Sequence, residues 1–199
     1  MVLPEELQEA IKTAKKNSSF GEPSLRSRIY ILKVIGNNSL TKHVNEGYYK
    51  RAKLALACAY KTLYIWDEYF PNEEEPRKIL KEAEKVFSGK ITLDELEKYY
   101  FQLKTYLDDK FLLGEKYFRG IYAGFSCWAA VGTVLYDSLS ETEEEGEINI
   151  PPEKLDSSFH SALAISNGAI WAEIGDTEAR KEFWNWYFDI AIPNVWQEI

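Results

Sequence analysis

The sequence predicts an all-α protein, a compact multi-helix bundle of about eight helices in a single domain, residues 1–199. Three observations lead to this fold class. Apolar residues recur at helical spacing along most of the chain, no stretch alternates convincingly as a strand would, and turn residues separate the helical stretches. A chain of 199 residues can bury roughly 70% of its unfolded surface, so it needs no disulfide or metal to fold.

The first part of the chain predicts two short amphipathic helices and one longer central helix. Apolar side chains follow helical spacing over residues 3–16 and again over residues 25–35, each stretch ending at turn-forming residues. The helix expected over residues 48–70 is apolar on all sides in its middle, which is typical of a central helix rather than a surface one. Pro71 is expected to end it.

Two further helices are expected to be amphipathic. Asn72 is placed to cap the first, which extends to residue 87, and Glu75 follows three residues later. Thr92 and Glu95 have the spacing of a capping box, and apolar residues behind them step by 3, 4, 3, 4. This stripe is the clearest amphipathic pattern in the chain, and it consists of Leu93, Leu96, Tyr100, Leu103 and Leu107.

The C-terminal part predicts two helices rich in small side chains, over about residues 115–139 and 156–173. Ala, Gly and Ser let helix backbones approach closely, so we expect these helices and the helix over 48–70 to form the centre of the bundle. The uncharged run 120–136 is 17 residues long, which is short of the ~20 that a membrane span needs. A last, aromatic helix begins near Asp176, and Pro193 is expected to break or kink it.

Composition restricts where the protein works and what it binds. The N-terminus is acidic and lacks the apolar segment of a secretory signal, which predicts a cytoplasmic protein. Cys58 and Cys127 lie in apolar runs without the spacing of a zinc or redox motif, so we expect buried, reduced thiols and no cofactor. The net charge of −8 disfavours nucleic acid as a partner, because phosphates attract Lys and Arg.

Motifs that would indicate catalysis are weak. His43 and His160 are the only histidines, so a site built on histidine would need one of them. Asp156 precedes His160 by four residues, which would place both on one helix face, where such a pair orients a base or, more commonly, stabilises the helix. Adjacent carboxylates such as Asp108 and Asp109 point about 100° apart on a helix and do not converge on one substrate.

Two acidic clusters are the candidate partner-binding residues. The first lies in a loop between helices, where five carboxylates within seven residues repel one another: Glu141, Glu143, Glu144, Glu145 and Glu147. The second is Asp67 and Glu68, at the end of the helix over 48–70, with Glu73, Glu74 and Glu75 beyond Pro71. Tyr69, next to Asp67 and Glu68, is a further candidate. Residues 121–199 carry a net charge of −11, whereas residues 1–120 carry +3, which predicts an acidic surface suited to a basic partner. A merely solvated loop or helix end is the alternative.

Several segments resemble a family of all-α immunity proteins from bacterial polymorphic toxin systems. The resemblance lies in residues 51–59 and 65–72, in Pro76, in residues 88–91 and in the aromatic C-terminal tail. It implies a cytosolic protein that binds and blocks a cognate toxin, and it implies no catalytic residues. Many toxins of such systems are nucleases, and an acidic inhibitor can cover their basic substrate-binding faces.

Two other functions stay open at this stage. One is an all-α enzyme that uses His160 with carboxylates from separate helices, which predicts His160 in a pocket with at least two other polar side chains. The other is a helical adaptor of unrelated function, which the sequence separates poorly from a toxin inhibitor.

Overall fold

The computed structural model describes residues 2–36, 45–137, 156–168 and 174–197. Over these ranges the chain is helical, and the isolated bridge between Ser19 and Glu22 is the β-type pairing that they contain. The all-α class predicted from apolar spacing is therefore confirmed. His43 and the five glutamates of the stretch 141–147 lie outside the described residues.

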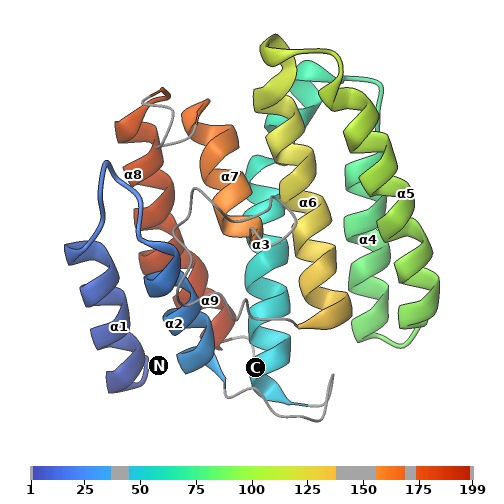
Figure 1. Cartoon of the computed structure of the whole chain (residues 1–199). Helices are drawn as coiled ribbons and strands as arrows, with labels where there is room; N and C mark the ends of the chain where they lie inside the picture. The colour runs from blue at the N-terminus through green and yellow to red at the C-terminus, as the bar shows by residue number, and fades with distance from the viewer. Residues whose placement is uncertain (1, 37–44, 138–155, 169–173, 198–199) are drawn as a thin grey trace.

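Four antiparallel helices form the larger of the two layers (Figure 1). They are α3 (Glu46–Tyr69), α4 (Glu75–Phe87), α5 (Leu93–Phe111) and α6 (Phe118–Tyr136). Successive helices are joined by short connections and run in opposite directions, so α3 and α5 end where α4 and α6 begin. A short 3₁₀ turn, Glu115–Tyr117, leads into α6.

The remaining helices pack on the other side of α3 (Figure 1). They are α1 (Glu5–Lys16), α2 (Leu25–Ile35), α7 (Ser157–Ser166), α8 (Thr177–Trp186), a π-helix (Tyr187–Ala191) and α9 (Ile192–Gln197). Because α8, the π-helix and α9 follow one another without a break, they correspond to the single aromatic helix expected at the C-terminus.

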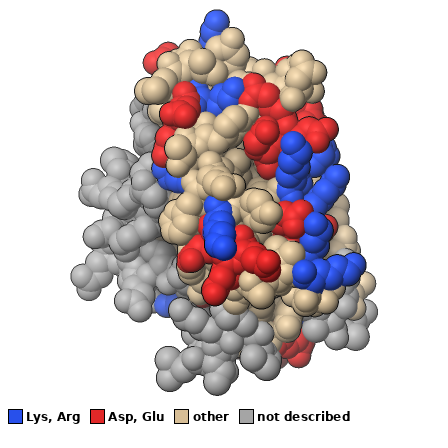
Figure 2. All heavy atoms as spheres, turned by 90° about the vertical axis from the view of Figure 1, so that its right-hand side faces the viewer, with Lys and Arg blue, Asp and Glu red and all other residues tan. Residues whose placement is uncertain are grey.

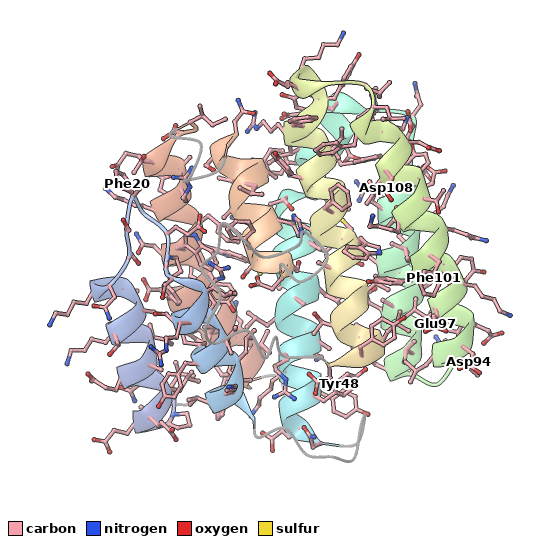
Figure 3. The ribbon with its side chains drawn as sticks, viewed as in Figure 1. Phe20, Tyr48, Asp94, Glu97, Phe101 and Asp108 are labelled. Carbon is pink, nitrogen blue, oxygen red and sulfur yellow. The ribbon has the colours of Figure 1, made fainter. Side chains whose placement is uncertain are left out.

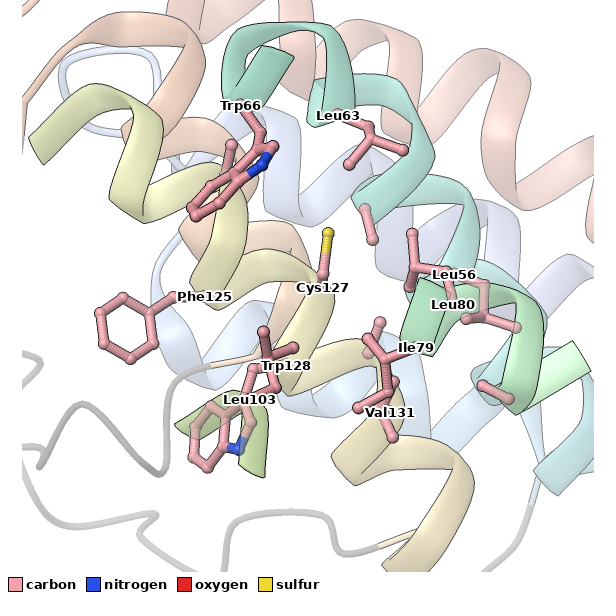
Figure 4. Close-up of a cluster of buried hydrophobic side chains, with 14 of the residues drawn as sticks. Leu56, Leu63, Trp66, Ile79, Leu80, Leu103, Phe125, Cys127, Trp128 and Val131 are labelled. Atoms are coloured by element: carbon pink, nitrogen blue, oxygen red, sulfur yellow. The ribbon is translucent and has the colours of Figure 1, made fainter. Parts of the chain in front are cut away.

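Helices α3 and α6 approach each other closely, as the small residues of α6 predict. A Cβ atom at Gly120 would lie 2.7 Å from the Cβ of Tyr69, and one at Gly124 would lie 2.9 Å from the ring of Trp66. Both distances are too short for a real side chain, so glycine is required at these two crossing points. The two helices bury the centre of the main apolar cluster between them (Figure 4).

Serine hydroxyls join α7 to α6 and α3. Ser126 lies 2.7 Å from the hydroxyl of Ser161, which also donates to the carbonyl oxygen of Cys58 at 3.0 Å. Ser157 donates to the carbonyl oxygen of Ala55 at 2.9 Å. These side chains are small enough to sit between closely packed helices, and the hydrogen bonds offset the cost of burying their hydroxyls.

The two cysteines are free and buried, as the apolar runs around them predict. Burial raises the pKa of both thiols, so they are uncharged at neutral pH. The uncharged run in α6 is likewise buried within the bundle, and none of the described helices combines the length and apolarity that crossing a membrane requires.

Of the two predicted helix caps at Thr92 and Asn72, the first is confirmed and the second is wrong. The capping box is confirmed, because the Thr92 hydroxyl accepts from the Glu95 N–H while the Glu95 carboxylate accepts from the Thr92 N–H. The prediction that Asn72 caps α4 is wrong. The Glu73 N–H donates to the Phe70 carbonyl at 3.1 Å, which places Asn72 inside a turn, and Glu74 is the N-cap residue instead.

Pro193, which is expected to break or kink the last helix, does not break it, since the helical chain continues to Gln197. One turn widens into the π-helix just before the proline, and Pro193 occupies the first turn of α9. Proline has no N–H to donate, and the wider turn just before it, in which the Ile192 N–H donates to the Tyr187 carbonyl, lets the helical chain continue through this position.

We predict that Leu103→Ala lowers the free energy of unfolding by about 2–5 kcal/mol, the usual cost of truncating a buried leucine. Leu103 is buried in the main apolar cluster, as its place in the 3, 4, 3, 4 stripe indicates. The matched control is Leu112→Ala just past the same helix, where the side chain is 84% exposed and the change should stay within about 0.5 kcal/mol. Urea unfolding of both variants checks the difference, and equal losses would contradict this account of the core.

Candidate functional site

The end of α3 carries the predicted binding residues that the structure describes. Asp67 and Glu68 are both exposed, and the Asp67 carboxylate forms an ion pair with Arg77 of α4 at 2.5 Å. Tyr69 is half-buried, since its Cβ lies against Gly120 of α6. The two carboxylates are therefore available to a partner, whereas Tyr69 contributes partly to packing between helices.

An apolar tip, which the sequence reasoning missed, lies at the same end of the bundle. It consists of Phe111, Leu112 and Leu113, all exposed, at the end of α5. The buried stripe of α5 would continue at positions 110 or 111, so that Leu112 and Leu113 fall beyond the face that packs on α6. Three consecutive large apolar residues before a glycine, of which Leu112 and Leu113 lie off the stripe, were the signal that could have identified it.

Contacts across the bundle bring the end of α3 and the apolar tip together (Figure 1). Glu73, just after α3, forms an ion pair with Lys110 at 2.5 Å, and the Phe70 ring stacks on Tyr117 with centroids 5.8 Å apart. We refer to the predicted binding residues of α3 and the apolar tip together as the α3–α5 end surface. Its members are Asp67, Glu68, Tyr69, Phe111, Leu112 and Leu113.

The face formed by α4 and α5 has a different character (Figure 2). Acidic and basic side chains are interspersed over it, and several form ion pairs, such as Lys104 with Asp108 at 2.7 Å. Asp94, Glu97 and Phe101 lie nearer the N-terminal end of α5 (Figure 3). Because charges of both signs alternate, this face has no strong field of one sign with which to attract a charged partner.

Most acidic residues of the C-terminal part either form ion pairs or lie outside the described residues. Four of its described carboxylates are in ion pairs, Asp137 with Arg51, Asp156 with Arg28, Glu178 with Lys181, and Asp189 with Lys15. Eight of the fourteen acidic residues beyond residue 120 lie outside the described residues.

His160 occupies the position of a core residue. It is buried, and its ring stacks on Phe125 at 5.7 Å and meets the edge of Phe159 at 6.3 Å. Asp156 is the N-cap of α7, so its carboxylate accepts from the Phe159 N–H at 2.9 Å and from Arg28 at 3.2 Å.

Within the described ranges, no three His, Cys, Asp or Glu side chains cluster as a metal site would require. A pocket beside Asp156 has a volume of about 60 Å³ and is lined by Asp137, Ser158 and Tyr187 among others.

A buried charge network lies between α2, α7 and α8. Arg28 lies between two carboxylates, 3.5 Å from Glu22 and 3.2 Å from Asp156, and it donates to the Pro23 carbonyl at 2.9 Å. Arg180 approaches the same Glu22 at 3.6 Å. Glu22, Arg28 and Arg180 are each no more than 2% exposed, so this network connects helices inside the protein and does not form an open site.

The charge of Arg28 sets the protonation of Asp156. Burial by itself would raise the pKa of this carboxyl, but the Arg28 charge and the hydrogen bonds from Ser158 and the Phe159 N–H outweigh that effect. The pKa of Asp156 is therefore lowered, and the carboxylate stays ionised and paired at neutral pH.

These features define a class of protein, an all-α bundle with an exposed apolar and acidic end and polar groups engaged in packing. The family model for Immunity protein Imm5 matches residues 7–194, which is most of the chain. The protein therefore belongs to the Imm5 immunity protein family, in agreement with the resemblance inferred from the sequence. Among curated proteins, none matches this chain significantly.

We predict that Asp156→Asn lowers the free energy of unfolding at pH 7 by about 3 kcal/mol, because Arg28 loses a buried charge partner while Asn still caps α7. The lowered pKa of Asp156 means that the wild type has this stabilisation above the unfolded-state pKa of about 4 and loses it as the pH falls further. The difference between the two proteins should shrink between pH 5 and pH 3. Urea unfolding at several pH values measures it, and a constant difference would contradict this assignment.

Proposed function

We propose that this protein neutralises a cognate toxin by binding it directly in the bacterial cytoplasm, without catalysing a reaction of its own. The observation that carries this proposal is the Imm5 family match over residues 7–194. The packing of His160 against Phe125 and Phe159 agrees with it, because a histidine buried in the core is not open to a substrate.

The α3–α5 end surface is our candidate for the contact region. Leu112 and Leu113 present apolar side chains to solvent, and exposed apolar residues rimmed by charged ones are typical of protein interfaces. Asp67 and Glu68 supply the charged rim. Burial of the two leucines would contribute most of the affinity, and the carboxylates would favour a partner with Lys or Arg at its own rim.

The glutamates at 141, 143, 144, 145 and 147 are our candidate for long-range attraction of a basic toxin. Support comes from their density in the sequence and from the residues that border the segment, because Asp137 and Asp156 are both tied to buried arginines. The charges thus belong to a segment whose two ends are fixed on the fold. Such charges raise association rates more than they raise affinity.

Co-expression tests the proposed function. A domain encoded at the C-terminal end of the gene immediately upstream should be lethal by itself and harmless when this protein is present. Isothermal titration of the two purified proteins should give a stable complex. Survival without a physical complex, or no protection at all, would contradict neutralisation by binding.

We predict that Leu112→Ala combined with Leu113→Ala weakens toxin binding by at least about tenfold, since each truncation removes exposed apolar area that the partner would cover. Folding should be nearly unchanged because both side chains are exposed. Titration calorimetry gives the affinity and a thermal melt gives the stability. An affinity equal to that of wild type would remove the apolar tip from the interface.

We also predict that replacing Glu143, Glu144 and Glu145 with Gln slows association several-fold at low salt and much less at high salt. Exposed charges are screened beyond ~8 Å at physiological ionic strength, so the effect should vanish as salt is added. The matched control replaces Glu5, Glu6 and Glu9 of α1 with Gln, which changes the net charge equally. Stopped-flow rates that respond alike in both variants would indicate a net-charge effect alone.

A further inference from the structure

One buried arginine is hydrogen-bonded to the backbone of two residues whose apolar side chains are exposed. Arg180 donates to the carbonyl oxygen of Phe20 at 3.2 Å and to that of Ile174 at 3.3 Å. The Phe20 side chain is 71% exposed and that of Ile174 is 59% exposed. The two residues come from loops far apart in the sequence, one before α2 and the other before α8, and one guanidinium fixes the backbone of both. Figure 3 places Phe20 at the outer edge of the molecule, on the loop between α1 and α2.

Phe20 has an unfavourable backbone conformation. Ser19 and Glu22 exchange two backbone hydrogen bonds of 2.9 Å, which closes a two-residue turn over Phe20 and Gly21. Both central residues have positive φ, +48° at Phe20 and +82° at Gly21. Turns of this kind favour Asn followed by Gly, because an L residue with a bulky side chain is strained in the left-handed region. A phenylalanine at this position is therefore unexpected on conformational grounds.

The structure beneath the turn prevents it from relaxing. Glu22, the last residue of the turn, is buried between Arg28 at 3.5 Å and Arg180 at 3.6 Å. A Cβ atom on Gly21 would lie 2.9 Å from the Thr177 carbonyl oxygen, so the turn also rests directly on the first turn of α8. The Phe20 ring is thus presented on a rigid support.

Folding stability explains neither the exposure of the ring nor the strain beneath it. An Asn at position 20 would relieve the strain and would remove an apolar ring from water. A rigidly presented aromatic side chain, by contrast, loses little freedom when a partner buries it, and such residues dominate the energetics of protein interfaces. Lys181 and Glu178, paired with each other at 2.7 Å on the adjoining turn of α8, supply a polar rim.

We propose that Phe20 and Ile174 form a second contact region for the toxin, in which the Phe20 ring enters an apolar pocket on the toxin surface. This inference rests on the proposed function. It commits to the toxin as the occupant, and a second copy of this chain is the alternative that the experiment separates.

The test compares wild type, Phe20→Asn and Ile174→Ala, with Phe101→Ala of α5 as the matched control for loss of an exposed aromatic ring. The probe is the domain encoded immediately upstream. Phe20→Asn should raise the Kd by at least about tenfold, in the range found for aromatic interface residues, while its melting temperature equals or exceeds that of wild type. Ile174→Ala should raise the Kd several-fold, and Phe101→Ala should leave it within about twofold.

The possible results separate the two proposals. If wild type protects and Phe20→Asn binds within twofold of it, the contact region is wrong and the proposed function stands. If wild type neither protects nor binds, both are wrong. A lower melting temperature for Phe20→Asn would overturn the argument from strain. A wild-type dimer in size-exclusion chromatography that Phe20→Asn converts to a monomer would assign the surface to self-association instead.

Discussion

The buried charge network of Glu22, Arg28, Asp156 and Arg180 is the constraint on which the arrangement of the outer helices depends. Removing ions from water costs several kcal/mol each, and that cost is offset only when every charge meets a partner at close range. Two arginines between two carboxylates meet this condition, with separations of 3.2 to 3.6 Å. These charges come from the turn before α2, from α2 itself and from the N-terminal ends of α7 and α8. The four segments must therefore come together in one arrangement.

The two layers of the protein are consequently held by different forces. Helices α3 to α6 pack through an apolar cluster with close backbone contacts at Gly120 and Gly124, where the free energy comes from buried area. The outer helices have an apolar cluster of their own, but polar contacts determine how their connecting segments are placed. Apolar packing tolerates sliding better than a network of directional hydrogen bonds, so the polar contacts fix the conformation of the segment before α2 and of Ile174 at the surface.

In this immunity protein, apolar packing in one layer and polar contacts in the other each support rigid features on the surface, where a partner could reach them. The α3–α5 end surface has its apolar tip just past a helix end, and the Phe20 turn is supported from below by buried charge. Neither surface feature has to order itself on binding, and preorganised contacts lose less entropy when a complex forms. Charge attraction would act earlier, on the rate of encounter, so the proposed acidic segment and the proposed apolar contact surface would serve different steps of the same binding reaction.

The sequence by itself determined the helices and their buried faces. The 3, 4, 3, 4 stripe with Leu103, the capping box at Thr92 and the buried cysteines all follow from residues within one or two turns of one another, and local spacing is what a sequence displays. Even locally, competing turn chemistry displaced the cap from Asn72, and a π-helix carried the chain past Pro193. Only the tertiary structure decided the partners of Asp156 and the convergence of Phe20 and Ile174 on Arg180. These depend on which distant segments meet, because burial and ion pairing are properties of the packed chain and leave no periodic signal in the sequence.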